Sequence, residues 1–142
     1  MENLNEILFY SLDKSIRSYR QFAHQKLSVQ GFDITIDQWL VLKSLHENPG
    51  CSQQQIAEIT FKDYASLTRI IELLVKKNYL ERAMHLQDRR RFTLTLTPQA
   101  LELLKAMQPV IINNRKQALK GLSGDDINKL QSMLNSIIQN CS

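Results

Sequence analysis

Three consecutive arginines at positions 89–91 form the densest group of chemically specific side chains in this sequence. They follow Asp88 and precede residues 92–97, in which apolar residues alternate strictly with threonines. Alternation with a period of two is typical of a β-strand that buries one face. Guanidinium groups bind phosphate oxygens and favour the narrow, electronegative minor groove of DNA. The pattern therefore predicts the second strand of a hairpin with a cationic tip.

The net positive charge of the chain lies around this predicted hairpin. The 142 residues include 18 Lys and Arg against 14 Asp and Glu, a net charge of +4. Residues 62–91 contain eight of the basic and four of the acidic side chains, so this segment carries the whole excess and the remainder is neutral. An uneven distribution of this kind is typical of a surface that binds a phosphate backbone.

An amphipathic helix is predicted directly before the hairpin, over residues 63–79. At about 100° per residue, Leu67, Ile71 and Leu74 share one face. The candidate DNA contacts on the other side are Ala65, Ser66, Thr68, Arg69 and Lys76. Small residues permit close approach to a major groove, hydroxyls can bond phosphates or base edges, and an arginine can donate two bonds to guanine. Taken alone, such a face favours a solvated helix surface, because faces of mixed charge are common. The helix-turn-helix before it and the basic hairpin after it favour DNA contact instead.

Each residue of the predicted wing tip is expected to have a separate role. The candidate DNA contacts are Arg89, Arg90 and Arg91, with Arg90 best placed to enter the minor groove. Asp88 is expected to pair with a neighbouring arginine and so position the tip. Arg82, on the opposing strand, is expected to touch the DNA backbone or to brace the hairpin.

Upstream of this region the sequence predicts three more helices. Apolar residues recur at helical spacing from Leu4 to Leu27, and Gly31 suits the end of that first helix. The T-x-x-Q pattern at residues 35–38 and the S-x-x-Q pattern at residues 52–55 are capping boxes, which predict where two shorter helices begin. Asp63 is placed to cap the helix that precedes the hairpin.

Two further helices are predicted after the hairpin. Thr97 and Pro98 read as an N-cap followed by proline at the first helical position. Pro109 should kink or split the helix that follows. Ser123 is expected to cap a last helix with an apolar stripe through Ile138. The predicted fold is mainly α (α+β), in the order α-α-α-α-β-β-α-α.

Composition favours one helical domain that pairs with a second copy. Only four glycines and three prolines occur, and 43% of the residues are hydrophobic. The apolar stripes of the terminal helices are wider than a monomer of 142 residues would cover, so a homodimer is expected. The sequence shows no leader pattern and no run of ~18 apolar residues, so we expect a cytoplasmic protein with no membrane partner.

These motifs together resemble the MarR (multiple antibiotic resistance regulator) family of winged-helix transcription factors. The matching segments are residues 66–71, 74–82, 88–90 and 94–97, and the Asp-Arg-Arg followed by an alternating strand ending in Leu-Thr is fairly specific. The helix order matches over nearly the full chain. Two positions depart from the pattern, because Asn78 and Ala100 stand where the family usually has glycine.

The resemblance implies a homodimer that places two winged helices on a DNA palindrome. Residues 1–34 and 98–142 would form the helical dimerisation region, and residues 35–97 would form the winged helix-turn-helix. The implied function is transcriptional regulation, usually repression, released by a small aromatic or anionic ligand. Tyr10, Arg17, Tyr19 and Trp39 are candidates for the ligand pocket, although each also fits a plainer role in the core or on a solvated helix face.

Other functional classes find little support in the residues. His24, His46 and His85 are too widely spaced to predict a metal site, and no cofactor is expected. Cys51 and Cys141 are expected to be free thiols, and the first helix lacks the cysteine of the peroxide-sensing branch of the family. We found no P-loop, nucleophile elbow or glycine-rich dinucleotide motif, so no enzyme is expected. A winged-helix module that binds proteins rather than DNA is the main alternative, and the localised charge argues against it.

Overall fold

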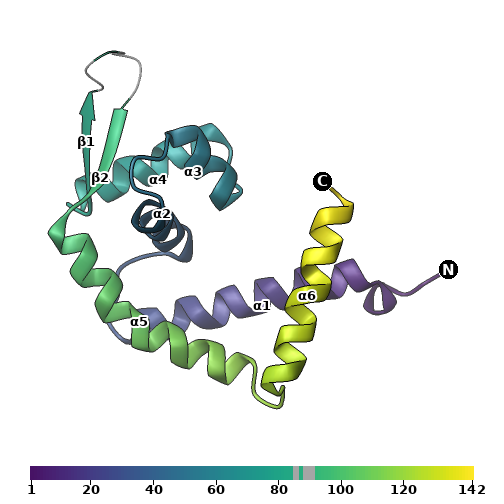
Figure 1. The fold of residues 1–142 in the computed structure, drawn as a ribbon. Helices are drawn as coiled ribbons and strands as arrows, with labels where there is room; N and C mark the ends of the chain where they lie inside the picture. Colours follow the sequence, from purple (N-terminus) through teal and green to yellow (C-terminus); the bar gives the residue numbers. More distant parts are fainter. Residues whose placement is uncertain (85–86, 88–91) are drawn as a thin grey trace.

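The predicted order of elements is confirmed in the computed structural model, which describes residues 1–84, 87 and 92–142 (Figure 1). The elements are η1 (Leu4–Glu6), α1 (Leu8–Val29), α2 (Ile36–Glu47), α3 (Gln53–Thr60), α4 (Tyr64–Lys76), β1 (Leu80–Met84), β2 (Phe92–Leu96), α5 (Pro98–Ala118) and α6 (Gly124–Asn140). One difference lies at the start. The predicted first helix is broken at Ile7, whose extended backbone separates the short 3-10 helix η1 from α1.

Side-chain caps set the helix boundaries that the sequence predicted. In the first capping box, the Gln38 amide donates to Thr35 Oγ1 at 3.0 Å and the Thr35 amide donates to Gln38 Oε1 at 3.0 Å. Ser52 forms the equivalent pair with Gln55 at the start of α3. Because each box satisfies two backbone donors that a helix leaves unpaired, these boundaries are encoded locally.

The turn of residues 77–79 between α4 and the hairpin contains one left-handed residue. Asn78 has a φ of 66°, and the next amide, that of Tyr79, donates to the Leu74 carbonyl at 2.9 Å. Asparagine tolerates this conformation better than most residues other than glycine. Asn78 therefore takes the place of the glycine expected here, and β1 begins two residues later.

Only part of the alternating strand reaches the core. Leu80 pairs with Leu96, and Leu94 is buried in the main hydrophobic cluster. The alternation over residues 92–97 predicts a buried apolar face that includes Phe92, and at Phe92 this is wrong, because Phe92 is 46% exposed and lies opposite Met84, beyond the end of the core. Its ring instead stacks under the Arg82 guanidinium, 5.2 Å from the ring centroid, so Arg82 braces the hairpin.

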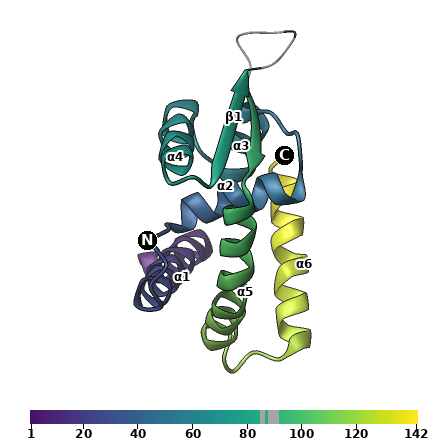
Figure 2. The same cartoon turned by 90° about the vertical axis from the view of Figure 1, so that its left-hand side faces the viewer.

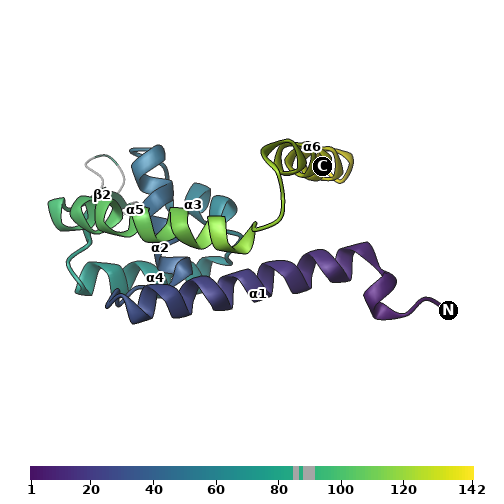
Figure 3. The ribbon, with the colours of Figure 1, turned by 90° about the horizontal axis from the view of Figure 1, so that it is seen from below.

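The helices that follow and precede the winged helix lie together on one side of the molecule. Helices α1 and α5 pack side by side below the helix-turn-helix, whereas the hairpin projects the opposite way (Figure 1). Helix α5 is not split at Pro109 but continues through it with a bend (Figure 1). Helix α6 stands clear of α1 in the side and lower views (Figures 2 and 3), and it buries none of its side chains.

Across the described ranges, no helix is both long enough and apolar enough to cross a bilayer.

Candidate nucleic-acid interface

Asp63 fixes where the exposed helix α4 begins. Its Oδ1 accepts a hydrogen bond from the Ser66 amide at 2.8 Å, and its Oδ2 accepts one from Ser66 Oγ at 3.0 Å. These bonds, the backbone one foremost, hold the pKa of the Asp63 carboxyl below its usual range. Asp63 is therefore a charged N-cap at neutral pH, which suits the positive end of the helix dipole.

The two faces of α4 divide as the sequence predicts. Leu67, Ile71 and Leu74 are buried and anchor the helix to the core. Ala65, Arg69 and Lys76 are exposed on the other side. Among the residues that the structure describes, no carboxylate forms an ion pair with Arg69 or Lys76. Their charges therefore remain available to a phosphate backbone or a base edge.

The two hydroxyls expected to contact DNA are already engaged within the protein. Ser66 Oγ donates to the cap residue Asp63, as above, and Thr68 Oγ1 donates to the Tyr64 carbonyl oxygen at 2.9 Å. Thr68 Oγ1 also accepts a bond from Gln53 Nε2 at 3.0 Å. Because a hydroxyl has one proton to donate and Tyr64 accepts it, Thr68 Oγ1 has no proton left to donate to DNA. DNA contact by both residues stays a prediction.

The wing tip lies outside the described residues. The predicted contacts Arg89, Arg90 and Arg91 and the predicted positioning residue Asp88 all fall in this gap. Their roles therefore stay predictions.

A small cavity opens where α1, α2 and α5 meet. Its volume is about 100 Å³, and its lining includes Tyr19 from α1, Trp39 from α2, and Asn114 and Arg115 from α5. Asn114 is only 2% exposed, and its Nδ2 has no hydrogen-bond partner among the described residues. A buried amide donor without a partner lowers the stability of the folded protein. A ligand oxygen in this cavity could accept a hydrogen bond from it.

Of the four residues expected to line a ligand pocket, the structure brings two together. Tyr19 and Trp39 line this cavity, whereas Tyr10 and Arg17 do not. Arg17 is exposed and pairs with Asp13 at 3.1 Å, one turn earlier on α1. Asn114 and Arg115 are not among the pocket residues predicted from the sequence. The available signal was an asparagine at helical spacing from Met107 and Ile111, where an apolar residue is expected.

An ionic cluster joins α1 to the helix-turn-helix. The Asp37 carboxylate on α2 accepts from Arg20 on α1, and its Oδ2 lies 2.9 Å from Nζ of Lys62 in the α3–α4 turn. Partial burial by itself would raise the pKa of Asp37, but the hydrogen bonds and charges of Lys62 and Arg20 outweigh it and lower that pKa. The cluster therefore stays ionised at neutral pH.

Among the described residues, the cysteines and the potential metal ligands form no second site. Cys51 and Cys141 are free thiols, and burial raises the pKa of the Cys51 thiol, which keeps it protonated and weakly reactive. Within residues 1–84, 87 and 92–142, no three side chains of His, Cys, Asp or Glu lie close enough together to hold a metal ion.

Comparison with known proteins finds a match to one family model. Residues 32–91, from the start of the helix-turn-helix to the wing, match the model of the MarR family. This segment of the chain is therefore similar to the MarR family. Over nearly the whole chain, solved structures share the same winged-helix fold.

Three of these structures illustrate the agreement. The PcaV transcriptional regulator from Streptomyces coelicolor, solved with its natural ligand, is 18% identical, with a TM-score of 0.86 over 100% of this chain and 99% of that one. BpsR from Bordetella bronchiseptica, whose DNA binding is regulated by 6-hydroxynicotinic acid, is 22% identical, with a TM-score of 0.86 over 96% of each chain. A MarR/EmrR family regulator from Acinetobacter sp. ADP1 is 22% identical, with a TM-score of 0.86 over 99% of this chain and 98% of that one.

Proposed function

We propose that this protein is a homodimeric repressor of the MarR family that binds a pseudo-palindromic operator and is released by a small ligand. The observation that carries the proposal is the exposed face of α4, where Arg69 and Lys76 have no ion-pair partner in the described part of the chain. The segment 62–91 around this helix also holds the entire excess of positive charge. An unpaired cationic helix face beside an arginine-rich hairpin is suited to duplex DNA.

The terminal helices support the dimer, with residues 1–34 and 98–142 as its interface and residues 35–97 as the DNA-binding unit. Helix α6 buries no side chain, although Leu130, Met133 and Ile138 along it are large and apolar. Exposed apolar stripes on helices are normally covered by a partner.

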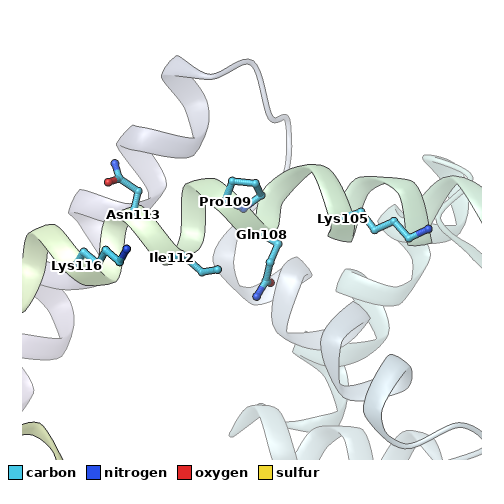
Figure 4. A pocket seen from close by; sticks show the side chains of 6 residues that line it. All are labelled: Lys105, Gln108, Pro109, Ile112, Asn113 and Lys116. Atoms are coloured by element: carbon cyan, nitrogen blue, oxygen red, sulfur yellow. The ribbon is translucent and has the colours of Figure 1, made fainter. Parts of the chain in front are cut away.

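Helix α5 has an open apolar surface of its own. At its middle, Pro109 and Ile112 lie between Lys105 and Lys116 around a hollow of about 500 Å³ (Figure 4). In Figure 4 Gln108 and Ile112 project from one side of the helix and Asn113 from the other. A second copy would cover the apolar part of this surface.

For the ligand, we propose a small aromatic acid in the cavity between α1, α2 and α5. Asn114 Nδ2 would donate to a ligand oxygen, and Arg115 would pair with a carboxylate. Tyr19 and Trp39 would pack on the ring. The cavity is smaller than the ~300–1,000 Å³ typical of sites for larger ligands, so it suits a single ring.

Selection of duplexes from a random pool tests this function. The dimer should enrich an inverted repeat whose half-sites are centred about 10 bp apart, because two recognition helices of a dimer lie about one DNA turn apart. Enrichment of no duplex at low salt would contradict DNA binding and would favour a protein-interaction module. Enrichment of a single half-site without symmetry would contradict the dimer.

A further inference from the structure

We propose that Gln53, the first residue of α3, reads an adenine in the major groove beside α4. The proposal rests on the DNA-binding function proposed above and adds to it a residue on a different helix. It is carried by one contact between the two helices of the helix-turn-helix and by what that contact leaves free on the Gln53 amide.

The Gln53 amide is held in one orientation by α4. Its Nε2 donates to Thr68 Oγ1 at 3.0 Å, and the same Thr68 Oγ1 donates to the Tyr64 carbonyl oxygen at 2.9 Å. Because the single hydroxyl proton of Thr68 is given to Tyr64, Thr68 can only accept from Gln53. The nitrogen of the amide must therefore face Thr68, and the side chain loses its rotational freedom before DNA arrives.

One donor and one acceptor remain on the anchored amide. The second N–H and the carbonyl oxygen Oε1 of Gln53 bond to no other residue in the described part of the chain. Adenine presents the complementary pair in the major groove, an acceptor at N7 and a donor at N6, and glutamine bonds both at once. A phosphate offers only acceptors, so the free Oε1 would face a negative oxygen there.

Three consecutive glutamines begin α3, and their environments differ. Gln55 uses its Oε1 in the capping box, where it accepts from the Ser52 amide at 2.8 Å. Gln54 is exposed and, among the described residues, bonds to nothing on α4. Gln53 is half-buried and joined to the recognition helix. The sequence alone gives no reason to distinguish the three glutamines. The contact with Thr68 distinguishes Gln53.

The surroundings of Gln53 leave room for a base edge. Gln53 lines a hollow of about 700 Å³ together with Tyr64, the first residue of α4, and with Phe92 and Thr93 of β2. The hollow lies between the start of α3, the start of α4 and the hairpin. Arg69 follows Thr68 on the exposed side of α4, so the Gln53 amide and the Arg69 guanidinium can engage neighbouring base pairs.

The experiment compares selected operators. The unchanged protein and the variants Gln53→Ala, Gln53→Glu and Gln54→Ala are each put through selection from the same random duplex pool. We expect Gln53→Ala to lose preference for adenine at one position per half-site, about tenfold in relative affinity, and to keep the rest of the motif. Gln53→Glu should prefer cytosine there, since a carboxylate accepts from cytosine N4. Gln54→Ala should select the original motif.

A chemical probe checks the same contact from the DNA side. Replacing the selected adenine by 7-deazaadenine removes N7 and should weaken binding of the unchanged protein severalfold, but not that of Gln53→Ala. Thr68→Val, which keeps the methyl group and removes the anchor, should lower the adenine preference, and Thr68→Ser should restore it. Circular dichroism and thermal melting confirm that each variant is folded.

The outcomes separate this inference from the proposed function. Selection of no motif by the unchanged protein would refute DNA binding, and the inference with it. A clear motif that Gln53→Ala also selects in full would refute the inference alone. If Gln53→Ala bound all duplexes more weakly by the same factor and selected an unchanged motif, Gln53 would contact a phosphate. That result would also overturn the inference.

Discussion

Asn114 is the residue at which stability and the proposed ligand binding conflict most clearly. Its Nδ2 is buried without a partner in the described structure, beside Tyr19 and Trp39. We expect Asn114→Leu to stabilise the protein by about 1 kcal/mol, because an unsatisfied buried donor is replaced by an apolar group of similar size. The same change should abolish ligand binding in the cavity. Urea unfolding measures the first effect, and calorimetry with small aromatic acids measures the second.

A destabilised Asn114→Leu variant would contradict this account, since it would mean that Nδ2 is satisfied in the folded protein. Unchanged ligand affinity would place the ligand elsewhere. Arg115→Met provides a comparison, because it removes the charge that we assign to the ligand carboxylate and leaves Asn114 in place.

Arg69 and Arg90 should differ in what they contribute to DNA binding. Arg69 lies exposed in the second turn of α4, where a guanidinium can donate two bonds to guanine. Arg69→Ala should therefore cost about 1–3 kcal/mol and relax the base preference at one position. Arg90→Ala should weaken binding by a similar amount but leave the base preference as it is. Fluorescence anisotropy on the selected operator and on single-base variants measures both, and wild-type affinity in both variants would show that the site is misassigned.

The Asp37 cluster links α1 to the helix-turn-helix through two ion pairs. The pKa of Asp37 is lowered in the folded protein, so its contribution to stability is present above its unfolded value of about 3.9 and is lost as the pH falls through the lower folded value. We expect Asp37→Asn to cost about 1 kcal/mol at pH 7 and progressively less below pH 4. Urea unfolding at several pH values measures the free energy of unfolding of Asp37→Asn and of the unchanged protein.

Asp13→Asn is the matched control for this cluster. Asp13 also pairs with an arginine, but the pair is exposed and joins two positions on α1 only. Exposed pairs of this kind contribute less than about 0.5 kcal/mol. An equal effect of the two substitutions would show that the link between elements adds nothing.

Helix α6 should hold two copies of the chain together. Leu130 lies on its exposed apolar stripe, so Leu130→Glu would place a charge in the proposed interface. We expect sedimentation to show a monomer of 16.5 kDa for this variant and twice that mass for the unchanged protein. Asn128→Glu, on the opposite side of α6, should remain a dimer. A dimer in both variants would mean that α6 is not part of the interface.

Across the whole molecule, locally encoded features were predictable and contacts between distant segments were not. The capping boxes at Thr35 and Ser52 need only four residues, so the sequence located both helix starts. Alternation assigned Phe92 to the correct face of β2 but could not show that the core ends before it. The bond from Gln53 to Thr68 spans fifteen positions and depends on how α3 packs on α4, which no local pattern encodes.

The distribution of charge was also readable in advance, since residues 62–91 carry the entire net charge. What charge alone cannot reveal is which cations are left unpaired. Lys62 belongs to the Asp37 cluster and Lys77 lies 3.6 Å from Asp33, so these two lysines stabilise the fold, whereas Arg69 and Lys76 remain exposed on α4.

The most direct test of the central claim is the salt dependence of DNA affinity. A dimer that neutralises several phosphates with arginine and lysine must release the counterions bound to them. We expect affinity for the selected operator to fall about a thousandfold between 50 and 200 mM salt, measured by fluorescence anisotropy. Affinity that is independent of salt, or no binding to any duplex at 50 mM salt, would contradict the account of α4 and the hairpin as a DNA-binding surface.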